Sequence, residues 1–217
     1  MARITVTGII LSATPMGEYD KRVVLLTKEC GKISAFARGA RRTKSPLMAG
    51  ANPFAFGQFE LYEGRDSYTL VNANIQQYFR ELSKDLDAAY YGFYFLELVD
   101  YFAREYTDEL QSLRLLYQSL RALINPSLPN RLVRLIYEIR LLKLNGEFPE
   151  PGSFHLSGDA QYAMHYIQTE PVEHLYSFVL SEAVLTELEQ IAHRYRIHAV
   201  DKPLKSLKML ELLEPPE

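Results

Sequence analysis

The residues with the clearest chemical meaning lie in one short loop near the start of the chain, residues 37–45, which read ARGARRTKS. Four of these nine residues are cationic: Arg38, Arg41, Arg42 and Lys44. Guanidinium groups fit phosphate oxygens, and several cations together release counterions from a nucleic acid. Gly39 lets the backbone come close to a ligand. The loop predicts a contact with a polyanion; the alternative is a solvated turn that only keeps the protein soluble.

The charge distribution supports the polyanion interpretation, because the basic residues gather in the first part of an acidic chain. Residues 1–79 hold 10 Lys and Arg and 6 Asp and Glu, a net charge of +4. Residues 80–217 hold 14 Lys and Arg and 21 Asp and Glu, a net charge of −7. Such an asymmetry indicates two parts with different partners. Lys21 and Arg22, which follow the turn PMGEYD, are candidates to extend the basic surface.

No pattern of residues predicts catalysis, a cofactor or a metal site. The sequence lacks GxxxxGK[ST], GxGxxG, GxSxG and HExxH, which excludes the common phosphate-loop, dinucleotide, hydrolase and zinc-protease motifs. The single cysteine, Cys30, excludes an intrachain disulfide and a cysteine-cluster zinc site. We therefore expect a binding protein rather than an enzyme. The sequence also lacks the pattern of a signal peptide or a membrane span, so we expect a soluble cytoplasmic protein.

The first 79 residues predict a small β-barrel. Five runs have the composition and turn boundaries of strands: residues 4–11, 22–28, 32–38, 53–64 and 67–77. Five short strands must bury one face, and a closed or nearly closed barrel does so without long free edges. Gly31 predicts a tight hairpin, and the alternation of apolar residues slips at Gly57, which predicts a bulge.

From about residue 80 the apolar residues recur three or four positions apart, which predicts amphipathic helices. The clearest helical segments are residues 82–105, 108–124, 129–146, 181–200 and 202–213. The stretch EFPEPG at residues 147–152 breaks the pattern, and weaker helical patterns follow it. The fold class is therefore α+β in more than one domain, with a barrel followed by an all-helical domain.

Two further groups of residues have a structural and a functional interpretation. The aromatic residues of the barrel strands could stack on bases, but their alternation favours the core for most of them: Phe36, Phe54, Phe56 and Phe59. Lys202, Lys205 and Lys208 recur every three residues. They either balance the negative end of a helix or dock an acidic segment of a partner.

Three segments together resemble the RecO family of bacterial recombination mediators. They are GEYDKRVVLLTKECGKISAFARGARRTKS, LMAGANPFAFGQFELYEG and KPLKSLKMLELL, and the resemblance runs from about Ile4 to Leu212. It implies a five-stranded OB-fold barrel over residues 1–79 and a helical domain over residues 80–217. It also implies a DNA repair and recombination function without ATP: binding of single- and double-stranded DNA, annealing of complementary strands and, with RecR, loading of RecA onto DNA coated by single-strand-binding protein. The protein would then be associated with the nucleoid.

The resemblance also assigns roles to individual residues. It implies DNA binding by the basic positions present here: Arg38, Arg41, Arg42 and Lys44, with Lys21 and Arg22. It further implies that the helical domain contacts the acidic C-terminal tail of single-strand-binding protein, for which the candidates are Arg131, Arg134, Lys202 and Lys205. Many members carry a four-cysteine zinc module after the third helix. Here its counterpart, at about residues 145–175, contains no cysteine, so we expect a metal-free module held by its own packing.

Two other functions fit parts of the same sequence. An OB-fold protein that binds RNA or the ribosome, with the helices as a docking domain, would use the basic loop equally well. The protein could also be an unrecognised hydrolase. In that case its reaction would survive mutation of the basic loop and would be lost on removal of a single carboxylate. A preference for RNA over DNA of matched sequence would favour the first of these alternatives.

Overall fold

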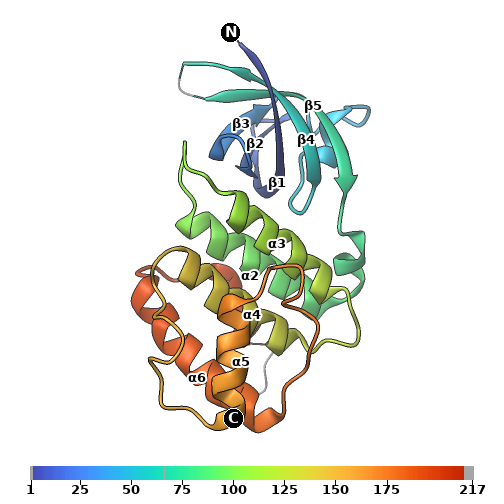
Figure 1. The fold of residues 1–217 in the computed structure, drawn as a ribbon. Helices are drawn as coiled ribbons and strands as arrows, with labels where there is room; N and C mark the ends of the chain where they lie inside the picture. The colour runs from blue at the N-terminus through green and yellow to red at the C-terminus, as the bar shows by residue number, and fades with distance from the viewer. Residues whose placement is uncertain (1, 66, 213–217) are drawn as a thin grey trace. The chain divides into compact units, whose positions relative to one another are not determined.

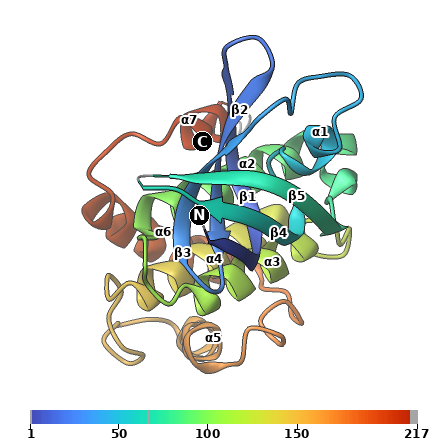
Figure 2. The ribbon, with the colours of Figure 1, turned by 90° about the horizontal axis from the view of Figure 1, so that it is seen from above.

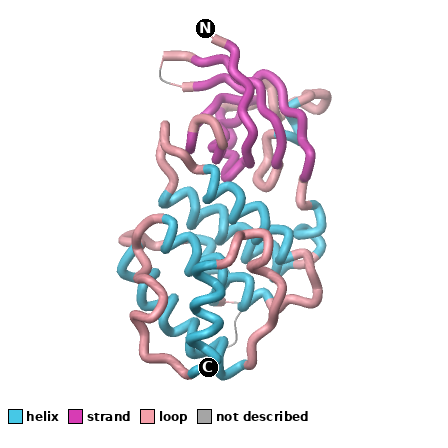
Figure 3. The backbone as a smooth tube through the Cα atoms, viewed as in Figure 1, coloured by secondary structure: helices cyan, strands magenta, loops and turns pink. Residues whose placement is uncertain are grey.

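A computed structural model describes residues 2–65 and 67–212 of this chain (Figure 1). The chain divides into two compact units, one of Met1–Arg80 with Phe102–Leu113 and one of Glu81–Tyr101 with Arg114–Glu217. Strands belong to the first unit and most helical residues to the second, as the colours of Figure 3 show. The predicted domain boundary between residues 79 and 80 stays a prediction.

The first unit contains a closed five-stranded barrel, as the sequence predicts. Its strands are β1 (Arg3–Met16), β2 (Asp20–Thr27), β3 (Gly31–Ala37), β4 (Phe56–Glu63) and β5 (Tyr68–Gln77). They follow the order β1-β2-β3-β5-β4, with β3 and β5 parallel and the other neighbours antiparallel. A short helix, α1 (Leu47–Gly50), lies between β3 and β4. This arrangement is that of an OB-fold.

The barrel core follows from the alternation along each strand. In β3 every second residue is buried, and the inward side chains Ile33, Ala35 and Ala37 meet Val23 and Leu25 from β2. Figure 2 shows the strands from above.

The bulge predicted at Gly57 is confirmed, because the register of β4 with β5 shifts between Phe56 and Gly57.

Gly31 is a position where the fold requires glycine. It opens β3 with a φ of 66°, in the left-handed region. The segment Phe102–Leu113 packs against it: Lys32 N donates to Arg104 O at 2.8 Å, and Tyr106 N donates to Cys30 O at 3.1 Å. A Cβ on Gly31 would lie 2.4 Å from the carbonyl oxygen of Arg104, which is backbone and has little freedom to move.

Replacing Gly31 by alanine is therefore expected to destabilise the barrel unit by more than about 2 kcal/mol, since strained backbone alone costs roughly 1–2 kcal/mol. Gly17→Ala is the matched control: Gly17 has a φ of 58°, but no atom lies within 4 Å of its added Cβ. Urea unfolding of both variants measures their free energies of unfolding. Gly17→Ala reports the cost of the positive φ alone, and the additional loss in Gly31→Ala reports the cost of the close contact with Arg104. A Cβ on Gly31 would also lie 2.9 Å from the carbonyl oxygen of Thr107. Equal losses of stability in the two variants would show that the backbone of Arg104 and Thr107 accommodates the methyl group.

The second unit is helical, as the sequence predicts. After the 3₁₀ turn η1 (Arg80–Lys84) come α2 (Leu86–Phe102), α3 (Leu110–Leu123), α4 (Asn130–Leu144), α5 (Gly158–Thr169), α6 (Glu182–Ala199) and α7 (Lys205–Glu211). α2 and α4 pack through large aromatic side chains: the rings of Phe95 and Tyr137 stack with centroids 4.2 Å apart, and Tyr137 Oη donates to Phe95 O at 2.8 Å. Among residues 2–65 and 67–212, no helix is both long and apolar enough to cross a membrane.

Candidate nucleic-acid interface

The basic loop, predicted at residues 37–45, spans residues 38–46 between β3 and α1, and its backbone is fixed to the β1–β2 turn and to the first residue of β2. Gly39, with a φ of 66°, donates its N–H to Asp20 Oδ1 at 2.7 Å. Arg41 N donates to Tyr19 O at 2.9 Å, and Arg42 N donates to Gly39 O at 3.0 Å. The loop therefore has a defined conformation, and it presents its cations together with the β1–β2 turn.

The four cations of the loop, Arg38, Arg41, Arg42 and Lys44, are all exposed. Arg41 Nη1 donates to Gly17 O at 2.8 Å, and the Arg42 guanidinium lies over the ring of Tyr19, 4.9 Å from its centroid. Within the described part of the chain, none of the four forms an ion pair with a carboxylate. Their charge is therefore available to an external anion.

Lys21 and Arg22 lie beside this loop, because Lys21 pairs with Ala37 at the end of β3. Lys21 is partly buried, and its Nζ donates to Ala51 O at 3.1 Å and to Asn52 Oδ1 at 2.6 Å. Burial, and then the charge of Arg41, lowers the pKa of Lys21. Lys21 thus fixes the segment that follows α1, in addition to adding charge. Arg22 is exposed, and its Nε donates to Ser34 Oγ at 2.8 Å.

The aromatic residues divide between core and surface. Phe59 is completely buried and Phe54 is 9% exposed, so both belong to the interior. Phe36 and Phe56 are only partly buried, and Phe36 lies opposite Arg22 in the β2–β3 register. Tyr19, which was not among the candidates predicted from the sequence, is 44% exposed, and the guanidinium of Arg42 lies over its ring. Its position in the turn PMGEYD, next to two cations, was the available signal, because aromatic rings beside cations form stacking platforms for bases.

The helical candidates for partner binding differ in how far their charge is already neutralised. Arg131 donates from Nη1 to Glu182 Oε1 and from Nη2 to Glu189 Oε2, both at 2.5 Å. The hydrogen bonds that Arg131 donates to Glu189 and Glu182 raise the pKa of its guanidinium group. The Arg134 side chain is 16% exposed, and its Nε donates to Glu138 Oε1 at 3.0 Å. Both arginines therefore bind carboxylates of the chain itself.

Lys202 and Lys205 are both exposed; Lys205 is the first residue of α7, and Lys202 lies three residues before it. Lys202 Nζ lies 5.1 Å from the ring centroid of Tyr101. The backbone N–H of Lys205 donates to Glu97 Oε1 at 2.9 Å, and that of Ser206 donates to Glu97 Oε2 at 2.7 Å. Partial burial raises the pKa of Glu97, but the hydrogen bonds from Ser206 and Lys205 outweigh it, so the net shift is downward. Glu97 thus caps α7 and fixes the backbone that carries Lys205.

The segment at residues 145–175 is held by aromatic packing and hydrogen bonds. Phe148, Phe154 and Tyr195 form a cluster with ring centroids 5.0–5.9 Å apart. Ser157 donates from N and Oγ to Glu187 of α6, at 2.9 Å and 2.7 Å. Within residues 2–65 and 67–212, no three His, Cys, Asp or Glu side chains are grouped so that they could hold a metal ion. Buried apolar side chains of the segment, among them Met164 and Ile167, add to this packing.

Comparison with known proteins agrees with the fold. The family described as Recombination protein O N terminal matches residues 1–79, and that described as Recombination protein O C terminal matches residues 83–150. The DNA repair protein RecO of Acetivibrio thermocellus is 28% identical over 99% of this chain and 98% of its own length. That of Alkaliphilus metalliredigens is 34% identical over 67% of this chain and 59% of its own length. That of Clostridium perfringens is 22% identical over 99% of this chain and 100% of its own length.

The two family matches together cover more than half of the chain. The first match ends and the second begins between β5, the last strand, and α2. The Acetivibrio relative extends the similarity to nearly the whole length of both chains. The chain therefore belongs to the RecO family of DNA repair proteins.

Proposed function

We propose that this protein is a non-catalytic mediator of DNA repair and recombination, which binds single- and double-stranded DNA through its barrel and anneals complementary strands. The carrying observation is the basic surface of Arg38, Arg41, Arg42 and Lys44, fixed in place by backbone hydrogen bonds and without carboxylate partners in the described part of the chain. Lys21 and Arg22 extend it. Membership of a DNA repair family favours DNA over RNA as the polyanion.

The proposed mechanism is electrostatic. Cations that neutralise the phosphates of one strand release its counterions and allow a second strand to approach, after which base pairing supplies the free energy of annealing. Contacts to phosphates position a strand without reading its sequence. Tyr19 and the partly buried Phe36 add rings on which bases stack. No step in this mechanism requires nucleotide hydrolysis.

The proposal extends to protein partners. We propose that, with RecR, the protein helps to load RecA onto DNA coated by single-strand-binding protein, in the bacterial cytoplasm and in association with the nucleoid. The proposed contacts with the acidic tail of single-strand-binding protein are Arg131, Arg134, Lys202 and Lys205. Lys202 and Lys205 carry most of this proposal, because the guanidinium groups of Arg131 and Arg134 already bind carboxylates of the same chain.

Annealing of two complementary DNA strands, each coated with single-strand-binding protein, tests the proposed function without ATP. We expect the protein to accelerate annealing, and we expect added salt to weaken this effect. Removal of the acidic tail of single-strand-binding protein should abolish the acceleration on coated strands and leave that on bare strands. Lys202→Ala/Lys205→Ala should reproduce this selective loss. DNA binding without any annealing, or a preference for RNA of matched sequence, would overturn the proposal.

A further inference from the structure

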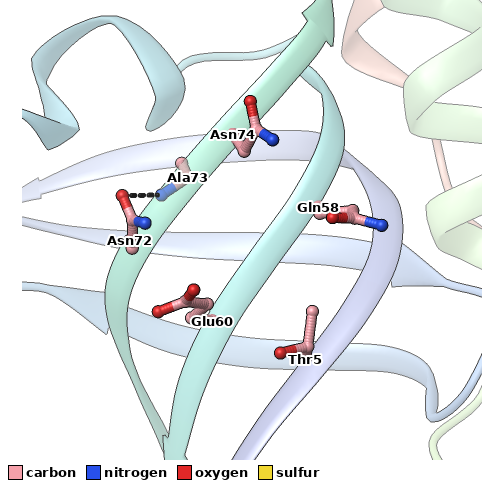
Figure 4. Close-up of a pocket in the computed structure, with 6 residues that line it drawn as sticks. All are labelled: Thr5, Gln58, Glu60, Asn72, Ala73 and Asn74. Atoms are coloured by element: carbon pink, nitrogen blue, oxygen red, sulfur yellow. Dashed lines mark hydrogen bonds between the residues drawn. The ribbon is translucent and has the colours of Figure 1, made fainter.

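The outer face of β1, β4 and β5 carries an unusual array of polar side chains. The strand registers place Thr5 beside Glu60 and Glu60 beside Asn72, while Gln58 lies beside Asn74. Side chains that are opposite each other on adjacent strands and point to the same face are near neighbours. These residues line a shallow cavity of about 320 Å³ on the surface of the barrel (Figure 4). The face is thus a compact cluster, dominated by carboxamides.

The composition of β5 is difficult to explain by folding alone. Its sequence, YTLVNANIQQ, has four carboxamide residues among ten, and Asn72, Asn74 and Gln76 are exposed. Asparagine is depleted in strands, where β-branched and aromatic residues are more stable. A run that opposes the local preference without a gain in packing is typical of a functional site.

The hydrogen-bonding groups of this face are largely unused. Asn72 Oδ1 accepts from the N–H of Ala73 at 3.0 Å, and Glu60 is paired with Arg3. In the described part of the chain, the side chains of Gln58 and Asn74 have no hydrogen-bond partner. In Figure 4 both carboxamides project from the strands on the same side. Two adjacent groups are therefore available, each with two donors and an acceptor.

The chemistry of the array selects its ligand. Among the described residues that line the cavity, the carboxylate of Glu60 is the only charged side chain, so the site does not favour a phosphate. Carboxamides pair with the amino group and ring nitrogen of adenine, and a carboxylate accepts from the amino group of cytosine. These edges are accessible in single strands, where bases are unstacked and unpaired.

The basic loop and the carboxamide face are connected through one strand. α1 follows the loop directly, and it packs against β5: a Cβ on Gly50 would lie 2.7 Å from Cβ of Ala73 and 3.3 Å from Ile75. Asn72 and Asn74 flank Ala73 on the same strand, and their side chains point to the outer face of β5, opposite to the face that α1 contacts. A single segment of β5 thus supports both the helix that ends the loop and the carboxamides.

We propose that the outer face of β1, β4 and β5, through Gln58, Asn72 and Asn74, binds the edges of unpaired bases in single-stranded DNA. This inference rests on the proposed function, in which the basic loop binds the phosphates of the same polymer. The face supplies the base contacts, and the loop supplies the charge. A DNA strand held in this way keeps its base edges in contact with the protein until a complementary strand displaces it.

The test compares the binding of an oligonucleotide that has its bases with that of an abasic strand of equal length. The variant is Gln58→Thr/Asn72→Thr/Asn74→Thr, which keeps residues suited to a strand. We expect it to lose about tenfold in affinity for the strand with bases, from a typical bidentate base contact. We expect no change in its affinity for the abasic strand or for duplex DNA, and an unchanged salt dependence.

The loop variant Arg41→Glu/Arg42→Glu serves as the comparison, because it should weaken binding to both strands equally and reduce the salt dependence. Wild-type affinity of the triple-threonine variant for the strand with bases would overturn the inference and leave the proposed function intact. Wild-type protein that binds neither strand would overturn both. Thermal unfolding of the variant, expected to match that of the wild type, separates loss of contacts from loss of fold.

Discussion

Replacement of Glu138 by alanine is expected to lower the free energy of unfolding of the helical unit by about 3–5 kcal/mol. Glu138 is 3% exposed on α4 and accepts hydrogen bonds from Tyr94 Oη at 2.5 Å and from Arg134 Nε at 3.0 Å. Arg196 Nε lies 3.5 Å from the same oxygen, with its side chain 5% exposed. The substitution removes the anion and leaves the buried Arg196 and the partly buried Arg134 close together without a counter-ion, which is why a large effect is expected.

Two comparisons make this prediction specific. Glu173→Ala breaks an ion pair with Arg114 in which both side chains are more than 40% exposed, so it should cost less than about 1 kcal/mol. Glu138→Gln keeps the shape and an acceptor oxygen but removes the charge. Chemical denaturation followed by far-ultraviolet circular dichroism measures all three variants. A loss for Glu138→Ala no larger than that for Glu173→Ala would contradict the account of this buried cluster.

The difference in free energy of unfolding between the wild type and Glu138→Gln should depend on pH. Burial raises the pKa of Glu138, but Arg134, Arg196 and the Tyr94 hydroxyl outweigh it, and the net shift is downward. A carboxyl group whose pKa is lower in the folded than in the unfolded protein stabilises the folded state. This contribution is complete above the pKa of the unfolded state, about 4.3, and is lost as the pH falls through the pKa of the folded state. The stability difference should therefore be largest near neutral pH and shrink below about pH 4.

Much of the fold could be predicted because its causes are local. Apolar alternation marked the barrel strands, a shift in that alternation at Gly57 marked the bulge, and spacings of three and four marked α2, α3, α4 and α6. The hairpin at Gly31 followed from the glycine. The packing of the segment Phe102–Leu113 against Gly31 could not be predicted, because it joins residues more than 70 positions apart.

The same distinction applies to the candidate site. Composition alone was sufficient to find Arg38, Arg41, Arg42 and Lys44, since adjacent cations in a loop are visible in the sequence. The structural role of Lys21, which donates to Ala51 and Asn52, depends on the folding of a loop 30 residues away. The ion pairs of Arg131 with Glu182 and Glu189 join α4 to α6. Such contacts have no pattern along the chain.

The second large effect is expected from Arg41→Glu/Arg42→Glu, which should weaken DNA binding about 10- to 100-fold at low salt. Both side chains are exposed beside the β1–β2 turn, and neither is paired with a carboxylate in the described part of the chain. The double substitution removes two phosphate contacts and adds two negative charges that repel the backbone. Because each contact to single-stranded DNA contributes about 0.7 to the slope of log K against log salt, the slope should fall by about 1.4.

Lys28→Glu/Lys84→Glu is the matched control, because it changes the net charge by the same amount. Both lysines are exposed, and Lys28 follows β2 at the end opposite Lys21. This control should retain most of the wild-type affinity and nearly all of the salt slope. A comparison of the two variants therefore separates a local contact from a general effect of charge.

The most direct test of the central claim, that the loop of residues 38–46 binds the DNA backbone, is a fluorescence titration of single-stranded DNA across a salt series. It should be made with the wild type, Arg41→Glu/Arg42→Glu and the lysine control. The account predicts a large loss of affinity and of salt slope for the arginine variant alone. Equal affinity and equal slope for the arginine variant and the wild type would contradict it and would place the DNA contact elsewhere on the protein.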